Sequence, residues 1–219
     1  MITTVIFDMD GLLFNTEPIY FECYKKAAAE DGLDFTFELF ESCVGMSRED
    51  ASHFITHHFG RDTDVQKMHD RTYTLFEEYL AADGEVHFRP GAKKAVEFFY
   101  NRGLKVALAS SNITRWVMFL LEKKGIKKYF SSVTTSDDVS TPKPDPEVYL
   151  KTAQKLGSDV SQCLVFEDSV AGATAAIAAQ MRTCVVPQIK KPTQFIRENA
   201  FKIYHSLEDI YPDMDELLS

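Results

Sequence analysis

From residue 88 to the C-terminus, short apolar runs of strand length alternate with amphipathic segments of helical length. Glycines such as Gly103 and Gly125 follow two of these segments directly, which is typical of helix ends. Strands separated by helices of this length predict βαβ units, which pair into a parallel sheet with right-handed crossovers. The predicted strands are "LKVALAS", "FSSVTTS", "CLVFED" and "RTCVVP".

The chain also begins with a strand pattern, because "TTVIF" precedes an acidic segment at residues 8 to 10. Residues 16–86, by contrast, are polar-rich and helical in pattern, and we find no convincing strand among them. We therefore predict an α/β fold in which residues 1–15 and 87–219 form a Rossmann-like core with a parallel sheet. Residues 16–86 are predicted to form an α-helical cap domain, inserted after the first strand.

Composition narrows the functional classes. The chain has 219 residues, of which 45% are hydrophobic and 26% charged, as in ordinary globular proteins. Its formal net charge of −9 argues against nucleic-acid and anionic-membrane partners, since both attract basic surfaces. No leader or long apolar run is present, and the four cysteines are scattered without a C-x-x-C pair. These features predict a cytoplasmic protein, and we expect a monomer.

The first predicted strand ends in two carboxylates, Asp8 and Asp10, followed by a glycine. Residues two apart on a strand project to the same side, so an extended backbone would bring these side chains together. Two like charges at that separation raise each other's pKa unless a cation lies nearby. The pair therefore indicates a metal site, a proton-transfer function, or both.

Other polar groups follow the remaining predicted strands. Ligands of parallel sheets bind at the carboxyl ends of the strands, so these groups are expected to converge there. Hard carboxylate oxygens suit Mg²⁺, while hydroxyl and ammonium groups suit phosphoryl oxygens. Each group also has a structural interpretation: a helix cap for Asp168, a turn for Ser-Ser-Asn, or a solvated lysine. The candidates are Asp8, Asp10, Ser110, Ser111, Asn112, Lys143, Glu167 and Asp168.

Four motifs stand in order along nearly the whole chain: "DMDG", "LASSN", "TPKPDPEVY" and "VFEDSVAG". On these motifs the sequence resembles the haloacid dehalogenase superfamily, specifically the β-phosphoglucomutase-like phosphatases with a small helical cap. The motif after "EDS" departs from the family, because "AAQM" replaces Ala-Gly-Met. Gln180 would then have to adopt a left-handed conformation, or the helix end must be built differently.

The resemblance implies that Asp8 is the nucleophile and forms an aspartyl-phosphate. Asp10 would protonate the leaving oxygen and later deprotonate the attacking water. Ser110 and Lys143 would hold the phosphoryl oxygens.

The resemblance also implies a Mg²⁺ site. The ion would be held by Asp8, the backbone carbonyl of Asp10, and Asp168, with Glu167 alongside.

The cap offers one candidate substrate-binding residue, Arg48, in a segment where Ser47 is placed to cap a helix. In mutases of this family a matching arginine contacts the far phosphate of the substrate. The alternative is a surface arginine beside Glu49. His53 and His57 have the four-residue spacing of metal ligands, but no third ligand is apparent, and we expect exposed polar residues.

The resulting hypothesis is a Mg²⁺-dependent phosphatase of small phosphorylated metabolites, either sugar or nucleoside monophosphates. A β-phosphoglucomutase-type mutase is the alternative, although Tyr20 stands near the place of the characteristic histidine of those mutases. A receiver-like signalling module is a third class. Receivers carry their aspartate on the third strand, whereas Asp8 follows the first.

Overall fold

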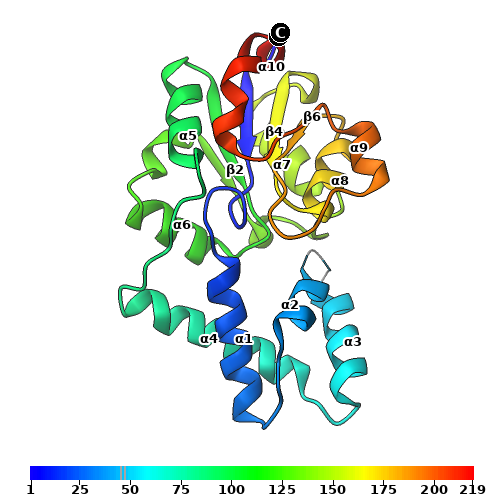
Figure 1. Cartoon of the computed structure of the whole chain (residues 1–219). Helices are drawn as coiled ribbons and strands as arrows, with labels where there is room; N and C mark the ends of the chain where they lie inside the picture. The colour runs from blue at the N-terminus through cyan, green and yellow to red at the C-terminus, as the bar shows by residue number, and fades with distance from the viewer. Residues whose placement is uncertain (45, 47) are drawn as a thin grey trace. The chain divides into compact units, whose positions relative to one another are not determined.

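The computed structural model describes residues 1–44, 46 and 48–219. Contacts divide them into two compact units (Figure 1). The core unit consists of Met1–Phe14 and Phe88–Ser219, and the helical unit of Asn15–His87. That residues 1–15 and 87–219 form a core domain and residues 16–86 a cap domain stays a prediction.

The core unit contains the predicted parallel sheet. Its six strands have the order β3-β2-β1-β4-β5-β6, and every pair is parallel, which confirms the expected α/β architecture. The direction of winding reverses between β1 and β4, and doubly wound sheets bind ligands at such a position. The strands are β1 Thr4–Phe7, β2 Lys105–Ala109, β3 Ser132–Thr134, β4 Cys163–Glu167, β5 Arg182–Val185 and β6 Lys202–Ile203.

Both faces of the sheet are buried, which explains why the central strands read as continuous apolar runs. On one face, Ile6 and Val165 pack in a cluster with residues of α7 and α8. On the other face, Phe7 stacks on Phe166 with ring centroids 5.3 Å apart, and Phe99 of α5 packs against both. Alternation along each strand therefore fills two separate apolar layers.

Helices of the core unit connect the strands as the sequence pattern predicts (Figure 1). Gln180, just past the end of α8, has φ 59°, so the left-handed conformation is the one of the two alternatives that the structure adopts. The α-helices are α5 Ala92–Asn101, α6 Thr114–Lys123, α7 Glu147–Leu156, α8 Val170–Ala178, α9 Gln194–Asn199 and α10 Met214–Leu218. The 3₁₀ turns are η1 Lys127–Tyr129, η2 Ser136–Asp138, η3 Val160–Gln162 and η4 Leu207–Asp213.

The two segments that lead into and out of the insertion pair with each other. Phe14 and Phe88 form an antiparallel bridge, and their rings lie 5.1 Å apart. Backbone hydrogen bonds flank the bridge, from Asn15 N–H to the His87 carbonyl and from Arg89 N–H to the Leu13 carbonyl. The chain thus returns to the sheet at the place where it left.

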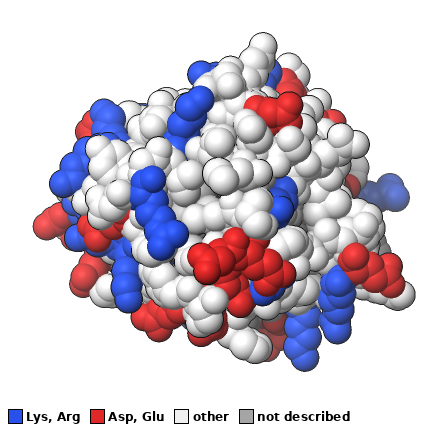
Figure 2. Space-filling view, turned by 90° about the horizontal axis from the view of Figure 1, so that it is seen from above, with Lys and Arg blue, Asp and Glu red and all other residues white. Residues whose placement is uncertain are grey.

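The helical unit contains α1 Glu17–Glu30, α2 Phe37–Cys43, α3 Arg48–Phe59 and α4 Val65–Ala81. Its described residues include no strand, as predicted. None of the helices in the described part of the chain has the length and apolar character needed to span a bilayer. All four cysteines are free thiols. Figure 2 shows acidic and basic side chains intermixed on one face of the molecule, with no extended basic patch on that face.

A buried histidine joins three helices of this unit. His69 of α4 accepts a hydrogen bond at Nδ1 from the Tyr24 hydroxyl of α1, over 2.8 Å. Its Nε2 lies 3.0 Å from Ser52 Oγ of α3. Ser52 donates its only hydroxyl proton to the Arg48 carbonyl, so Nε2–H of His69 must be the donor to Ser52. This chain of donors and acceptors requires a neutral imidazole.

The pKa of His69 is lowered to about 4, chiefly by burial and additionally by the nearby charge of Arg48. An unfolded histidine has a pKa of about 6.5. Between these two values the unfolded chain binds the proton and the folded chain does not. Folding stability should therefore fall as the pH drops through this window.

We expect His69→Gln, which cannot titrate, to lose less stability than the wild type between pH 7 and pH 4.5. The difference should be roughly 1–3 kcal/mol, since one pKa unit corresponds to about 1.4 kcal/mol. Urea unfolding at both pH values measures it. His53→Gln alters an exposed histidine and is the matched control, which should follow the wild type. Equal pH dependence of His69→Gln and the wild type would contradict the assignment.

Candidate active site

Strand register places three residues at one level of the sheet edge. Phe7 pairs with Leu108 of β2 and with Phe166 of β4. The next residue of each strand is therefore Asp8, Ala109 or Glu167, and all three stand side by side across the centre of the sheet. The Asp8 N–H donates to the Phe166 carbonyl over 3.1 Å, which continues the ladder past the end of β1.

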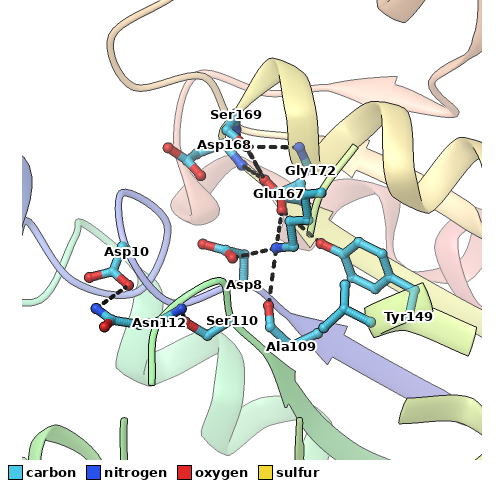
Figure 3. Close-up of polar contacts among 12 residues, drawn as sticks. Asp8, Asp10, Ala109, Ser110, Asn112, Tyr149, Glu167, Asp168, Ser169 and Gly172 are labelled. Carbon is cyan, nitrogen blue, oxygen red and sulfur yellow. Dashed lines mark hydrogen bonds and ion pairs between the residues drawn. The ribbon is translucent and has the colours of Figure 1, made fainter. Parts of the chain in front are cut away.

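Lys143 binds all three of these residues (Figure 3). Its Nζ donates to Asp8 Oδ1 at 2.7 Å, to the Ala109 carbonyl at 3.1 Å and to Glu167 Oε1 at 2.6 Å. Only 5% of the lysine side chain is exposed, so the two ion pairs are shielded from water. The solvated-lysine alternative is therefore wrong for Lys143.

Glu167 is fully buried and accepts five hydrogen bonds. Oε1 accepts from Lys143 and from the Tyr149 hydroxyl, the latter over 2.7 Å. Oε2 accepts from the N–H groups of Asp168 and Ser169 and from Ser169 Oγ, over 2.9 to 3.0 Å. The two N–H groups belong to the start of α8, where the helix end favours negative charge. Ser169, not Asp168, caps this helix through its hydroxyl, which accepts from the Gly172 N–H.

The three charged groups shift one another's pKa values. Burial raises the pKa of Asp8 well above its ordinary value, Lys143 opposes this, and the Glu167 charge adds to it. Burial also acts on Lys143 and Glu167, but the charges of Asp8 and Glu167 outweigh it at Lys143, and the charge of Lys143 outweighs it at Glu167. As a result the pKa of Lys143 is raised well above its usual range, and the pKa of Glu167 is lowered. The buried cluster therefore favours an additional positive charge, which would let Asp8 ionise.

The acidic residues fit a divalent cation. Ligand oxygens of Asp8, Glu167 and Asp168 lie within 4.8 Å of one another, and this is the group that the described residues form. Hard carboxylate oxygens in a buried, negatively charged site suit Mg²⁺. The carboxylate of Asp10 does not belong to the group. Among the like charges that raise the pKa of Asp8, Glu167 outweighs Asp10, so the expected crowding comes mainly from a neighbouring strand.

The structure separates the Ser-Ser-Asn segment into three different environments. Ser110 is buried at the end of β2, and its Oγ accepts from the Asn112 N–H over 3.0 Å. Asn112 reaches toward Asp10, with Nδ2 3.5 Å from Oδ2, as Figure 3 shows. Ser111 is exposed. Ser110 and Asn112 thus lie at the edge that carries the acids, whereas Ser111 faces solvent.

The candidates of the helical unit lie in a different setting. Arg48 begins α3, pairs with Asp70 over 3.1 Å and lies over the ring of Tyr73, and half of its side chain is exposed. It therefore has another partner than Glu49. His53 and His57 are exposed, and neither joins a group of metal ligands among the described residues. The predicted cap residue Ser47 lies outside the described residues.

Sequence reasoning missed three contributors to this site. Tyr149 reads as part of the apolar face of a helix, and nothing in the pattern marks its hydroxyl. The Ala109 carbonyl has no side-chain signature at all. Gly172 is required by close packing, because a Cβ there would lie 1.6 Å from Glu167 Oε1. A glycine inside an otherwise alanine-rich helix was the available signal.

The sequence model of the haloacid dehalogenase-like hydrolases matches residues 5–186. The chain belongs to this family. It is 30% identical to a phosphorylated carbohydrates phosphatase of Thermotoga maritima, over 94% of this chain and 87% of that protein. It is 32% identical to hexitol phosphatase B of Escherichia coli, over 85% and 84% of the two chains.

Solved structures show the same likeness. A structure from Thermotoga maritima, provisionally assigned as a β-phosphoglucomutase, has TM-score 0.78 and 28% identity and covers 99% of this chain and all of its own. A β-phosphoglucomutase from Clostridium difficile has TM-score 0.80 at 22% identity, covers 100% and 97% of the two chains, and shows the fold alone. These comparisons confirm the predicted superfamily and an enzyme of the phosphoric monoester hydrolase class.

Gly172→Ala tests the space that Glu167 occupies. The added methyl would force the carboxylate or the helix to move, and we expect a loss of ~2–4 kcal/mol in the free energy of unfolding despite better helix propensity. Urea denaturation measures this. Gly103→Ala is the matched control, because Gly103 has open space and only a positive φ, and it should cost about 1 kcal/mol. A Gly172→Ala protein as stable as the wild type would disprove the close approach.

Proposed function

We propose that this protein is a Mg²⁺-dependent phosphatase of small phosphorylated metabolites, which acts through an aspartyl-phosphate on Asp8. The observation that carries the proposal is the buried Asp8, bonded to Lys143 and adjacent to Asp168 at the edge of a parallel sheet. The two phosphatases named above act on phosphorylated carbohydrates and hexitol phosphates by name, which supports sugar or polyol phosphates as substrates. The cytoplasmic location and the monomeric state stay predictions.

In the proposed first step, an oxygen of Asp8 bonds to phosphorus while the ester P–O bond breaks. Asp10 gives its proton to the departing alcohol oxygen. Lys143 and Ser110 hold the phosphoryl oxygens, which carry the charge of the transition state. Asp8, Asp168 and the Asp10 carbonyl are the groups that would hold Mg²⁺, which when bound neutralises phosphoryl charge.

In the second step, water attacks phosphorus and Asp10 removes its proton. The bond between phosphorus and Asp8 breaks, phosphate leaves, and the Asp8 carboxylate is restored. Asp10 therefore alternates between acid and base, and its contact with Asn112 gives it a fixed neighbour during both steps.

A β-phosphoglucomutase-type reaction is the second candidate, because the Thermotoga maritima structure, 28% identical to this chain, carries that name. Tyr20 argues against it. Its ring stacks on Phe76 with centroids 4.3 Å apart, so an aromatic packing residue stands near the place where those mutases have a histidine. A substrate screen that records both free phosphate and isomerised sugar phosphate separates the two reactions.

Asp8→Asn should abolish phosphate release, with a loss on the order of 10³-fold or more, because an amide cannot form the covalent intermediate. Release of phosphate from sugar phosphates, with and without Mg²⁺, is the measurement. Asp159→Asn removes an exposed carboxylate of the same unit and should retain wild-type turnover. An Asp8→Asn protein that keeps a tenth of the wild-type activity would exclude the nucleophile.

Arg48 is proposed to bind the part of the substrate remote from the transferred phosphate. Arg48→Ala should then lower kcat/KM for the best natural substrate, while a small aryl phosphate is hydrolysed as before. Lys143→Ala should impair both substrates. Arg71→Ala is the control, because Arg71 also pairs with two carboxylates of the helical unit. If Arg48→Ala leaves the natural substrate unaffected, Arg48 is a surface residue.

A further inference from the structure

Tyr149 lies at the centre of the buried cluster, although the proposed reaction does not use it. It stands in the first turn of α7 and is fully buried. Its hydroxyl donates to Glu167 Oε1 over 2.7 Å, and its ring centroid lies 5.0 Å from Lys143 Nζ. One side chain thus contacts both members of the ion pair.

Glu167 has little capacity for a further partner. A carboxylate offers about four lone-pair positions, and five donors already surround this one. Gly172 closes the remaining side, where not even a methyl group would fit. The carboxylate is therefore held on every side by groups of this chain.

The surroundings of Asp168 and Asp8 differ from those of Glu167. Figure 3 shows the carboxylates of Asp8, Asp10 and Asp168 on one side of Glu167, and Tyr149 on the opposite side. The three aspartate carboxylates thus lie on the side away from the Tyr149 ring. Lys143 donates one hydrogen bond to Asp8 and one to Glu167.

We propose that Tyr149 is a positioning residue whose hydroxyl fixes Glu167, and that Glu167 anchors the Lys143 ammonium instead of serving as a ligand of the divalent cation. The proposal rests on the phosphatase function proposed above. A lysine side chain has four rotatable bonds, so a fixed anchor is needed to hold its ammonium at the reacting phosphoryl group. Tyr149 and Glu167 together supply that anchor.

Tyr149→Phe isolates the hydroxyl because it keeps the ring and its packing. A hydrogen bond to a charged group is worth about 1.5–3 kcal/mol, so kcat should fall about 10- to 100-fold. KM should change less than kcat, because Lys143 is proposed to act on phosphoryl charge that is largest in the transition state. Tyr129→Phe is the matched control, since the Tyr129 hydroxyl donates to Glu97 in the same unit, and its kcat should stay at the wild-type value.

Metal affinity tests the second half of the proposal without any substrate. Isothermal titration of the metal-free protein with Mg²⁺ gives Kd for each variant. Glu167→Gln and Asp168→Asn each remove one negative charge, but only Asp168→Asn also removes a ligand. Asp168→Asn should therefore weaken binding by about tenfold or more beyond the effect of Glu167→Gln. A loss of affinity in Glu167→Gln equal to that in Asp168→Asn would show that Glu167 is a metal ligand, and the proposal would fall.

NMR of lysine ammonium groups tests the anchor independently of activity. A buried, triply bonded ammonium exchanges slowly and should give a resolved signal, which Lys143→Arg assigns. This signal should shift or broaden in Tyr149→Phe and remain unchanged in Tyr129→Phe. An unchanged signal, or a kcat within about twofold of the wild type, would refute the role of Tyr149. If the wild type hydrolyses no phosphate ester, the phosphatase proposal fails, yet the NMR and Mg²⁺ measurements still decide the anchor.

Discussion

One ammonium group, that of Lys143, lies between two buried carboxylates, and the site depends on this contact. Removing the lysine would leave two carboxylates without a counter-charge and shielded from water, which costs several kcal/mol. The sheet register brings Asp8 and Glu167 to the same level, because β1 and β4 are neighbouring strands. The Lys143 ammonium forms an ion pair with each of the two carboxylates. The same two ion pairs therefore stabilise the folded chain and hold the groups of the candidate site in place.

The charge balance of that cluster favours a cation. Two carboxylates and one ammonium leave an excess of negative charge, and burial disfavours the ionised form of Asp8, whose pKa is raised. In the proposed reaction Asp8 must be ionised to act as the nucleophile, so a cation bound beside it would favour that reaction. The charge of Lys143 and the hydrogen bonds to Glu167 lower the pKa of Glu167, which favours its ionised form.

The parallel sheet and the sheet-edge position of the site could be predicted, because strand-length apolar runs end in polar groups and parallel strands end at one edge. The exact partners could not. The position of Glu167 at a strand end and the family resemblance predict a place at the metal site, and only its five donors reveal a second possibility. His69 sits in an ordinary amphipathic helix, and its contacts come from two other helices. Such pairings depend on tertiary packing, which periodicity does not encode.

The bridge between Phe14 and Phe88 has a consequence for how such a chain varies. The two ends of the insertion are hydrogen-bonded neighbours. The length of the inserted segment therefore does not affect the pairing of the strands. An insertion of this kind can be shortened, enlarged or exchanged for another while the sheet and the polar residues at the carboxyl ends of its strands keep their geometry. In the proposed phosphatase, exchange of this module would replace Arg48 and leave Asp8 and Lys143 unchanged.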